Sequence, residues 1–473
     1  MVNIKMERGV RKLISPAIVW VIVLFLALSC GDGGLGLLLS GGGISGTGRF
    51  LGIITGFGSV FVNGVEIETT DETNILIDDV SANENALKVG MKVEIEAFDN
   101  VASLVTYTSE IKGPIESGSI NTANNSFSVL GQKVIVDDTT IYEGVSGFAA
   151  LQENNIVEVS GFADANADIQ ATFVELEDSS LQEFQIRGTV SDHNGSNKTF
   201  NINNILINYS NIQNPPGISN GFSVEVKGRL DANVLEAAEI EIEDFSYGEG
   251  DEVEMEGVIT SLTSQSDFVV NNQRVQTTSK TTYEHGTASN IAENIRVEIK
   301  GEVNSSSILV AEQVEFRFVE SKSIKIEGAV QSVDTENSTV SVFGITIHVD
   351  ANTGLKDEVQ ELRPFTLADI QDEDFLDVGG FVDDEGNVIA VILERDEMPE
   401  QDEFELRGPV DSETPNMALE ILGVSVNISG AFDNSNDASA FFSTIDAGDI
   451  VEVKGSFSGE MFIASEVEIE ILI

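Results

Sequence analysis

A strand–turn–strand segment is repeated along the whole chain, and its last copy is the clearest. Residues 448–471 alternate apolar with polar residues on both sides of a short turn. Alternation with a period of two is typical of β-strands that bury one face. The same plan recurs in five earlier segments, which are 90–110, 155–177, 221–243, 294–316 and 374–394. Because the copies keep their strands but differ in length, we expect one repeated β unit with variable loops.

Each copy also carries earlier elements in a constant order. It opens on a short strand around a glycine, and these glycines are Gly52, Gly113, Gly188, Gly257, Gly328 and Gly408. A tight hairpin follows, with two central residues suited to positive φ, as in Asn63-Gly64. A polar segment, predicted to be partly helical, then leads to the closing hairpin. Its clearest example is 436–447, which would bury Phe441, Phe442 and Ile445.

The order strand, strand, strand, short helix, strand, strand is that of an OB-like Greek-key barrel. A small sandwich is the alternative, because strand order cannot be read from one sequence. We therefore expect an all-β chain of about six tandem small OB-like barrels, each with a short helix or helical turn. Short acidic linkers between the copies favour a string of barrels over one globule. The expected segments are a signal peptide at 1–29, a glycine-rich tether at 30–48, and repeats at 49–110, 111–182, 183–251, 252–322, 323–402 and 403–473.

The chain is strongly acidic. Its 80 acidic and 25 basic residues give a formal net charge of −55, which repels phosphate backbones and argues against nucleic acid as a partner. In the closing strands, glutamates occupy every second position, as in 239–243 and 466–470. These glutamate ladders predict strands with one apolar face and one solvated acidic face. Their like charges should cost stability at low salt, and less when salt screens them.

The N-terminal segment has the layout of a secretory leader. A basic head precedes an apolar run at 17–28, which is short for the roughly 20 residues of a membrane-spanning helix. An uncleaved anchor, or a plain signal peptide cut nearby, is the alternative. Cys30 follows this run and is the only cysteine of the chain, so no intramolecular disulfide can form.

The residues before Cys30 resemble the lipobox of bacterial lipoproteins, with Ala27 and Leu28 departing from its commonest form. The resemblance implies that Cys30 becomes the first residue of the mature protein and carries lipid, which makes the membrane a partner. Gly31 stands where an aspartate would signal retention at the inner membrane. This implies attachment to the outer membrane of a Gram-negative bacterium, facing the periplasm or the cell surface.

A second resemblance lies in the first copy. Residues 56–65 read Gly-Phe-Gly-Ser-Val-Phe-Val-Asn-Gly-Val, preceded by glycine-rich 43–48 and followed by Leu-Lys-Val-Gly-Met at 87–91. This combination resembles an uncharacterised family of bacterial envelope lipoproteins with tandem repeats, known as domain of unknown function 5666. The other five copies keep the framework of strands and glycines but lack the Gly-Phe-Gly-Ser start. The resemblance implies an exported, β-rich repeat protein and brings no catalytic residues.

One turn has the carboxylate spacing of a calcium loop. Asp164, Asn166 and Asp168 alternate as calcium ligands do, and Glu175 stands at the twelfth position. The sixth position holds Ile169 in place of the usual glycine, so we favour a solvated β-turn over a metal site. Diffuse binding of divalent cations to the glutamate ladders is the stronger expectation.

No other motif defines a catalytic or cofactor site. His348 beside Asp350 suggests a triad, but its alternating strand favours a surface histidine. Residues 46–52 lack the lysine-serine pair of a phosphate-binding loop. The aromatic residues that could stack on a sugar, with the core as the alternative place for them, are Phe57, Phe61, Tyr107, Tyr142, Tyr209, Tyr247 and Tyr283.

These patterns predict a protein without enzymatic activity and without a cofactor. We expect a lipid-anchored repeat protein of the cell envelope that serves as a spacer or an interaction module. The alternative is an envelope protein that binds a carbohydrate or another polymer on an OB-like barrel face, modulated by divalent cations. The expected partner besides the membrane is an envelope polysaccharide or protein.

Overall fold

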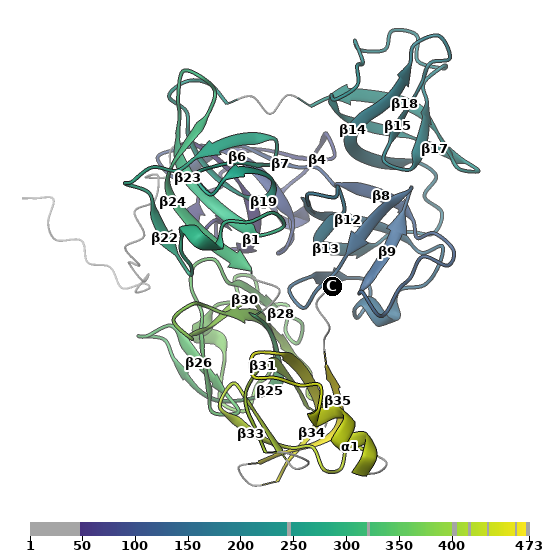
Figure 1. Ribbon diagram of the computed structural model, residues 1–473. Helices are drawn as coiled ribbons and strands as arrows, with labels where there is room; N and C mark the ends of the chain where they lie inside the picture. The colour runs from purple at the N-terminus through teal and green to yellow at the C-terminus, as the bar shows by residue number, and fades with distance from the viewer. Residues whose placement is uncertain are drawn as a thin grey trace, which may run out of the picture. The chain divides into compact units, whose positions relative to one another are not determined.

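The chain is all-β, with 56% of the residues that the structure describes lying in strands (Figure 1). The computed structural model describes residues 48–243, 247–318, 322–399, 404–414, 418–432, 435–458 and 461–469. The predicted signal peptide at 1–29, Cys30 and the tether up to residue 47 lie outside these ranges. Within them, no helix has the length and apolarity needed to cross a membrane.

The strands group into six units, which we number in chain order. Unit 1 contains β1 (Gly48–Gly56), β2 (Val60–Val62), β3 (Val65–Ile67), β4 (Asn74–Ile77), β5 (Val80–Ser81), the 3-10 turn η1 (Glu84–Ala86), β6 (Lys92–Phe98) and β7 (Val101–Tyr107). Unit 2 contains β8 (Ile111–Pro114), β9 (Ser126–Val129), β10 (Gln132–Ile135), β11 (Ile141–Glu143), η2 (Phe148–Ala150), β12 (Ile156–Ala163) and β13 (Ile169–Leu176). Unit 3 contains β14 (Phe184–Asn194), β15 (Thr199–Ile202), β16 (Ile205–Asn208), β17 (Ser223–Asp231) and β18 (Val234–Ile242).

The second half of the chain follows the same plan. Unit 4 contains β19 (Glu252–Ser264), β20 (Asp267–Val270), β21 (Gln273–Gln276), β22 (Thr282–Glu284), η3 (Ala288–Asn290), β23 (Arg296–Val303) and β24 (Leu309–Phe318). Unit 5 contains β25 (Ser323–Asp334), β26 (Thr339–Val342), β27 (Ile345–His348), β28 (Gly354–Asp357), η5 (Leu367–Asp369), β29 (Phe375–Val382) and β30 (Val388–Asp396). Unit 6 contains β31 (Phe404–Thr414), β32 (Ala418–Ile421), β33 (Val424–Asn427), α1 (Ser435–Phe442), β34 (Ile450–Ser458) and β35 (Met461–Ile469).

Within each unit, five of the strands pair in a ring. They are the first strand, the two strands of the hairpin that follows it, and the two strands of the closing hairpin. In unit 3, β14 pairs with β15 and β17, β15 with β16, and β17 with β18, all antiparallel, while β16 runs parallel to β18. Units 4, 5 and 6 repeat these pairings. In units 1 and 2, one link of the ring is a single bridge, Glu68 to Val101 and Ile115 to Val129 respectively. The alternating apolar residues of the strands form the buried cores.

The glycine of each first strand makes room for the hairpin turn that follows. At Gly328, a Cβ atom would lie 2.3 Å from the ring of Phe343. Phe343 and Gly344 have φ values of 55° and 80°, the positive values that a two-residue turn needs. Asn63 and Gly64 have φ values of 54° and 71° in unit 1. Both turns were predicted from the sequence, and the structure confirms them.

A helical turn precedes the closing hairpin in five of the units. It is a single 3-10 turn in units 1, 2, 4 and 5, and the only α-helix of the described residues, α1, lies in unit 6 (Figure 1). After α1, Ile445 is buried as expected, whereas Phe441 and Phe442 are only half-buried. Unit 3 has no helical turn within its described residues. Its segment contains Pro215 and Pro216, which lack the amide donor that a helix needs.

The units are not separate, because their first strands pair with one another. Strand β1 runs parallel to β19, β8 antiparallel to β14, and β25 antiparallel to β31. Each of the three sheets, with 13, 11 and 11 strands, therefore contains strands of two units. The prediction of a string of separate OB-like barrels is therefore wrong, because pairs of units share a sheet. The sheets continue from one repeat into another, as they do in a β-solenoid.

A bulge at a glycine in the closing strands leads to a prediction for stability. The register of β12 against β13 shifts between Ser160 and Gly161, and a Cβ atom on Gly161 would lie 2.2 Å from the carbonyl oxygen of Gln170. Because that oxygen cannot move without displacing its strand, Gly161→Ala should lower the free energy of unfolding by about 1–3 kcal/mol. Chemical unfolding measures this change. Gly217→Ala is the control, since nothing lies within 4 Å of its Cβ position, and an equal loss in both variants would contradict the argument.

Candidate functional site

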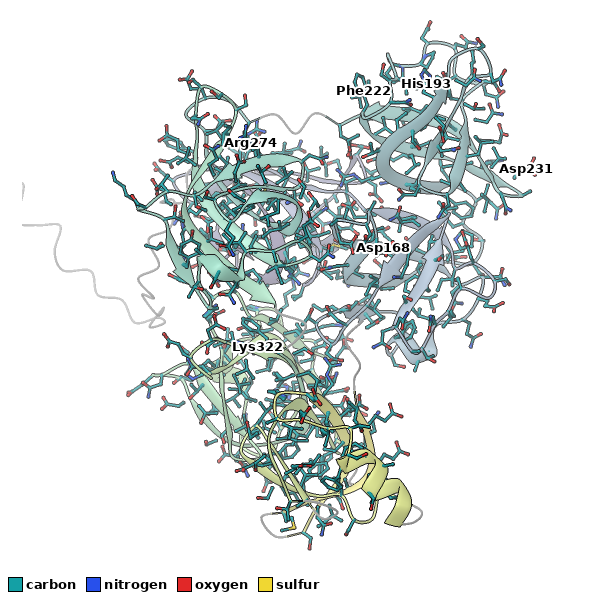
Figure 2. All side chains as sticks on the ribbon, viewed as in Figure 1. Asp168, His193, Phe222, Asp231, Arg274 and Lys322 are labelled. Atoms are coloured by element: carbon teal, nitrogen blue, oxygen red, sulfur yellow. The ribbon has the colours of Figure 1, made fainter. Side chains whose placement is uncertain are left out.

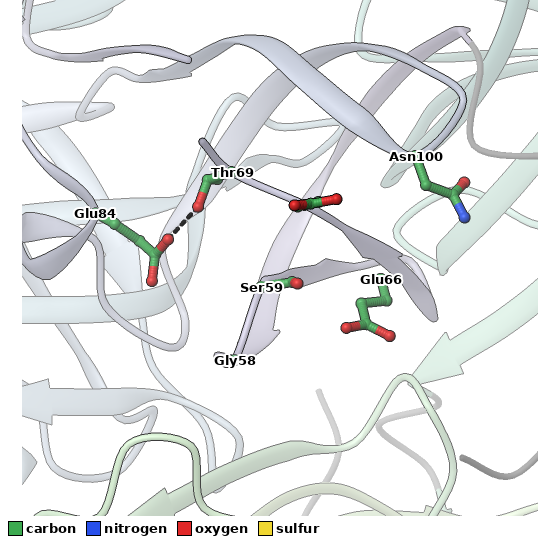
Figure 3. A pocket seen from close by; sticks show the side chains of 7 residues that line it. Gly58, Ser59, Glu66, Thr69, Glu84 and Asn100 are labelled. Atoms are coloured by element: carbon green, nitrogen blue, oxygen red, sulfur yellow. Dashed lines mark hydrogen bonds between the residues drawn. The ribbon is translucent and has the colours of Figure 1, made fainter. Parts of the chain in front are cut away.

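Unit 1 has an open hollow of about 540 Å³, which we call the unit 1 hollow. Its lining residues are Gly58, Ser59, Glu66, Glu68, Thr69, Glu84 and Asn100. They come from the turn between β1 and β2, from β3 and the residues that follow it, from η1, and from the turn between β6 and β7. Figure 3 shows their side chains around the hollow.

The lining of the unit 1 hollow offers hydrogen-bonding groups and negative charge. The hydroxyl of Thr69 donates to the carboxylate of Glu84 (Figure 3). Glu66 and Glu68 are exposed, and in the described part of the chain neither forms an ion pair with a Lys or Arg. Glu84 interacts with the charge of Arg363, which also donates to its main-chain oxygen. Carboxylates without a cation accept hydrogen bonds from hydroxyl groups and repel anions. The hollow therefore suits a neutral, hydroxyl-rich ligand.

A loop of unit 5 supports the wall of the unit 1 hollow. The guanidinium of Arg363 lies 3.4 Å from the centre of the Phe57 ring and donates to two main-chain carbonyl oxygens of unit 1 at 3.0 and 2.7 Å. Gly58 has a φ of 117°, and a Cβ atom there would lie 3.3 Å from Pro364. The Gly-Phe-Gly-Ser stretch that distinguishes the first copy is thus one of the places where unit 5 contacts unit 1, and Thr55, which donates to the carbonyl oxygen of Ala351 at 3.3 Å, is another.

The turn with calcium-like spacing is closed by its own hydrogen bonds. Asp164 Oδ1 accepts from the amides of Asn166 and Asp168 at 2.8 and 2.9 Å. Asp168, labelled in Figure 2, pairs with Lys133 at 3.2 Å. Glu175 lies on the following strand, β13. These residues do not converge, and no group of three or more His, Cys, Asp or Glu among the described residues could hold a metal ion.

His348 and Asp350 do not form part of a triad in the described structure. His348 is half-buried on β27. Asp350 closes a turn by accepting from the amide of Asn352 at 2.8 Å. Within the described residues, no hydrogen bond joins His348 to Asp350 or to a serine.

Most of the aromatic residues considered for sugar stacking belong to the core. Those with less than a tenth of their surface exposed are Phe57, Tyr107, Tyr209 and Tyr247. Of the remaining three, Phe61 lies opposite Glu66 in the hairpin of β2 and β3. Phe61 is therefore the one candidate platform beside the unit 1 hollow.

The ladder glutamates Glu239, Glu241, Glu466 and Glu468 are exposed as predicted. Many glutamates on other alternating strands are buried instead, and the prediction of solvated faces is wrong for them. On unit 4, four glutamates that are 1% to 6% exposed lie among three buried cations; they are Glu254, Glu256, Glu298 and Glu315, with Arg296, Lys300 and Arg317. Glu256 accepts from Arg296 at 2.7 Å and from the amide of Ile53 in unit 1 at 3.3 Å. Burial opposes the ionisation of Glu256, but the two arginines outweigh it and lower the pKa of this carboxyl. Burial and the neighbouring Glu315 raise the pKa of Glu298 well above its usual value.

A second chain of largely buried ion pairs links units 1 and 3, and an aromatic ring of unit 2 lies against it. Lys92 of unit 1 pairs with Glu110, and Arg187 of unit 3 pairs with the same carboxylate at 3.1 Å. The ring of Phe162 from unit 2 lies between Lys92 and Arg296, at 5.3 and 5.5 Å from the two cations. The outward faces of these strands are thus the surfaces through which the units contact one another. A Lys or Arg two residues from a Glu on the same strand face was the sequence signal for this burial.

Units 5 and 6 share a row of charged side chains across four strands. The register places Asp377 beside Glu327, Glu327 beside Glu405, and Glu405 beside Lys454. Lys454 pairs with Glu405 at 3.1 Å. Burial, together with the neighbouring Glu452 and Glu327, raises the pKa of Glu405 to about 7. This carboxyl therefore titrates near neutral pH.

The repeated units and their shared sheets define an all-β repeat protein. The family model described as Domain of unknown function (DUF5666) matches residues 52–109, 112–175, 256–315, 327–394 and 407–468. The chain belongs to this family. The model matches five repeats where the sequence predicted six, and unit 3 lies outside the matched segments although its strands pair as those of the other units do. No curated protein matches the chain.

The row of charged side chains shared by units 5 and 6 predicts that the free energy of unfolding depends on pH. The pKa of Glu405 is about 7 in the folded protein and about 4.3 in an unfolded chain. Between these values the folded state binds the extra proton, so the free energy of unfolding should fall as the pH rises. We expect the ionisation of Glu405 to lower the free energy of unfolding by about 1–3 kcal/mol between pH values of about 5 and about 8.

Chemical unfolding of Glu405→Gln checks this expectation. A glutamine resembles the protonated carboxyl, so the variant should match the wild type at the lower pH and be more stable at the higher pH. Glu468→Gln, on an exposed position of β35, is the control and should leave the pH dependence unchanged. If the wild type instead gained stability relative to Glu405→Gln as the pH rises, the raised pKa of Glu405 would be contradicted.

Proposed function

We propose that the protein is a non-enzymatic, lipid-anchored repeat protein of the cell envelope whose units form a fixed spacer or interaction module. The observation that carries this proposal is the set of largely buried ion pairs between units, such as Lys112 with Asp78 and Arg187 with Glu110. Removing one partner of a buried pair costs about 3–5 kcal/mol. The pairs therefore favour one arrangement of the units over others, which suits a spacer that holds its shape.

We further propose that each unit is a small barrel of the OB type. The support is the ring of pairings, in which the first strand lies between the second and the fourth and the third strand runs parallel to the fifth. A closed ring leaves no unpaired edge within the unit. OB barrels bind ligands on the face of strands two and three, between the loops that follow strands one and four.

Lipid on Cys30 would attach the mature chain to the outer membrane, and labelling of cells with palmitate tests this step. We expect label on the wild-type protein and none on Cys30→Ala, because the thiol is the only possible attachment point for a lipobox lipid. Protease treatment of intact cells then distinguishes the cell surface from the periplasm. Equal labelling of both proteins would remove the anchor from the proposal.

A second candidate function is the binding of a neutral carbohydrate or another hydroxyl-rich envelope polymer in the unit 1 hollow. The hollow lies between the turns after β1 and β6 and beside β3, where an OB barrel binds its ligand. Its carboxylates accept hydrogen bonds from hydroxyl groups, and Phe61 offers a ring face beside Glu66. Divalent cations would associate diffusely with the same carboxylates and modulate binding.

A glycan array probed with the full chain tests the second candidate. We expect binding to neutral envelope glycans, and its loss in the double variant Glu66→Gln and Asn100→Ala, which removes a charged acceptor and an amide from the lining. Glu336→Gln, an exposed position on unit 5, is the matched control. Binding that is absent from all neutral glycans, or equally strong in the double variant, would reject this function.

A further inference from the structure

A second cavity, of about 200 Å³, lies where units 1, 2, 3 and 4 meet. We call it the junction cavity. It is smaller than the roughly 300 Å³ at which sites for drug-sized ligands begin. The junction cavity therefore has room for one small molecule.

The strand register defines the walls of the junction cavity. On the outward face of unit 1, Glu94 lies opposite Leu51 on one side and Thr106 on the other. On unit 3, Thr189 lies opposite Ser223. All five residues line the cavity, so its two main walls are the faces of paired strands, which are rigid supports for a ligand.

The charged groups at the junction cavity already have partners. Glu110 holds Lys92 and Arg187, and Arg187 pairs with a second glutamate as well. Glu94 pairs with Arg49 at 3.6 Å. A charged ligand would have to compete with these buried or half-buried pairs, and separating buried charges is unfavourable. A neutral ligand leaves them in place.

The rest of the lining combines hydroxyl groups with apolar surface. The hydroxyls of Thr106, Thr108 and Thr189 make no hydrogen bond with the described protein. Leu51 and Ile169 supply aliphatic surface beside them. A sugar ring has the matching chemistry, because its hydroxyl groups both donate and accept while its C–H faces pack on apolar side chains.

We propose that the junction cavity binds one small, neutral, polyhydroxylated molecule, a monosaccharide or a polyol of similar size. The site is separate from the unit 1 hollow and does not depend on the function proposed for that hollow. Because four units contribute to the cavity, a bound molecule stabilises their arrangement by mass action. The thermal stability of the protein should therefore rise with the concentration of the ligand.

Saturation-transfer NMR on the full chain tests the proposal. The neutral probes are D-glucose, N-acetylglucosamine and glycerol, and the charged probes are glucuronate and glucosamine. We expect at least one neutral probe to bind and to raise the melting temperature, and the charged probes to bind more weakly. The double variant Thr106→Val and Thr108→Val keeps the shape of the side chains but removes two hydroxyls, so it should weaken binding at least about tenfold. Thr346→Val, exposed on β27, should keep the wild-type affinity.

Three results would overturn the proposal: no neutral probe binds, only charged probes bind, or the threonine double variant binds as the wild type does. If the double variant does not fold, Asn272→Ala replaces it, since this exposed side chain also lines the cavity and should give a similar loss. Binding that disappears in the Glu66→Gln and Asn100→Ala variant, but not in the threonine variant, would locate the sugar in the unit 1 hollow. That outcome rejects the junction site and leaves the second candidate function intact.

Discussion

Ion pairs between the outward faces of strands, added to the strand pairing that joins the units two by two, hold the repeated units of this chain in their arrangement. Each unit has a dry interior built from alternating apolar residues, but its outward faces carry Glu, Lys and Arg. Where two units meet, these charges lose their water and need partners. Lys112 of unit 2 with Asp78 of unit 1, and Arg187 of unit 3 with Glu110, provide them at 2.8 and 3.1 Å. Each contact surface therefore has its own arrangement of charged side chains, whereas the apolar interiors of the units are similar to one another.

This arrangement gives a physical role to the few basic residues of an acidic chain. Of the 25 lysines and arginines, several are less than a tenth exposed, and these are Arg296, Lys300, Arg317, Arg395 and Arg407. Arg407 pairs with Asp138 of unit 2 at 2.8 Å. The other four pair with acidic side chains of their own unit and so neutralise its buried outward face. Other acidic groups, such as Glu466 and Glu468, stay on the surface, where a large negative charge repels other anions. Buried pairs add specificity more than stability, which fits a protein whose proposed role depends on its shape.

Local features of the fold could be predicted from the sequence, and the contacts between units could not. The turn at Asn63-Gly64 follows from local backbone rules, and strand alternation follows from a period of two. Alternation identifies the residues that share a face but not what covers that face. Glu298 and Glu468 both stand between apolar residues on a strand, yet Glu298 is buried and Glu468 is exposed. Whether another part of the protein covers the strand face decides between burial and exposure. In the sequence, Lys300, two residues after Glu298, was the one local indication that Glu298 is buried.

The candidate site shows the same division. The Gly-Phe-Gly-Ser stretch stood out in the sequence, but its contact with Arg363 depends on a loop far away in the chain. The distance between units 1 and 3, which ion pairs join and no shared sheet of the described residues does, is the most direct measurement of the central claim. Spin labels on cysteines at Glu72 and Asp231, both exposed, in a Cys30→Ala chain would report it by pulsed electron paramagnetic resonance. The account predicts one narrow distance distribution. A broad distribution, as separate units on flexible linkers would give, would contradict it.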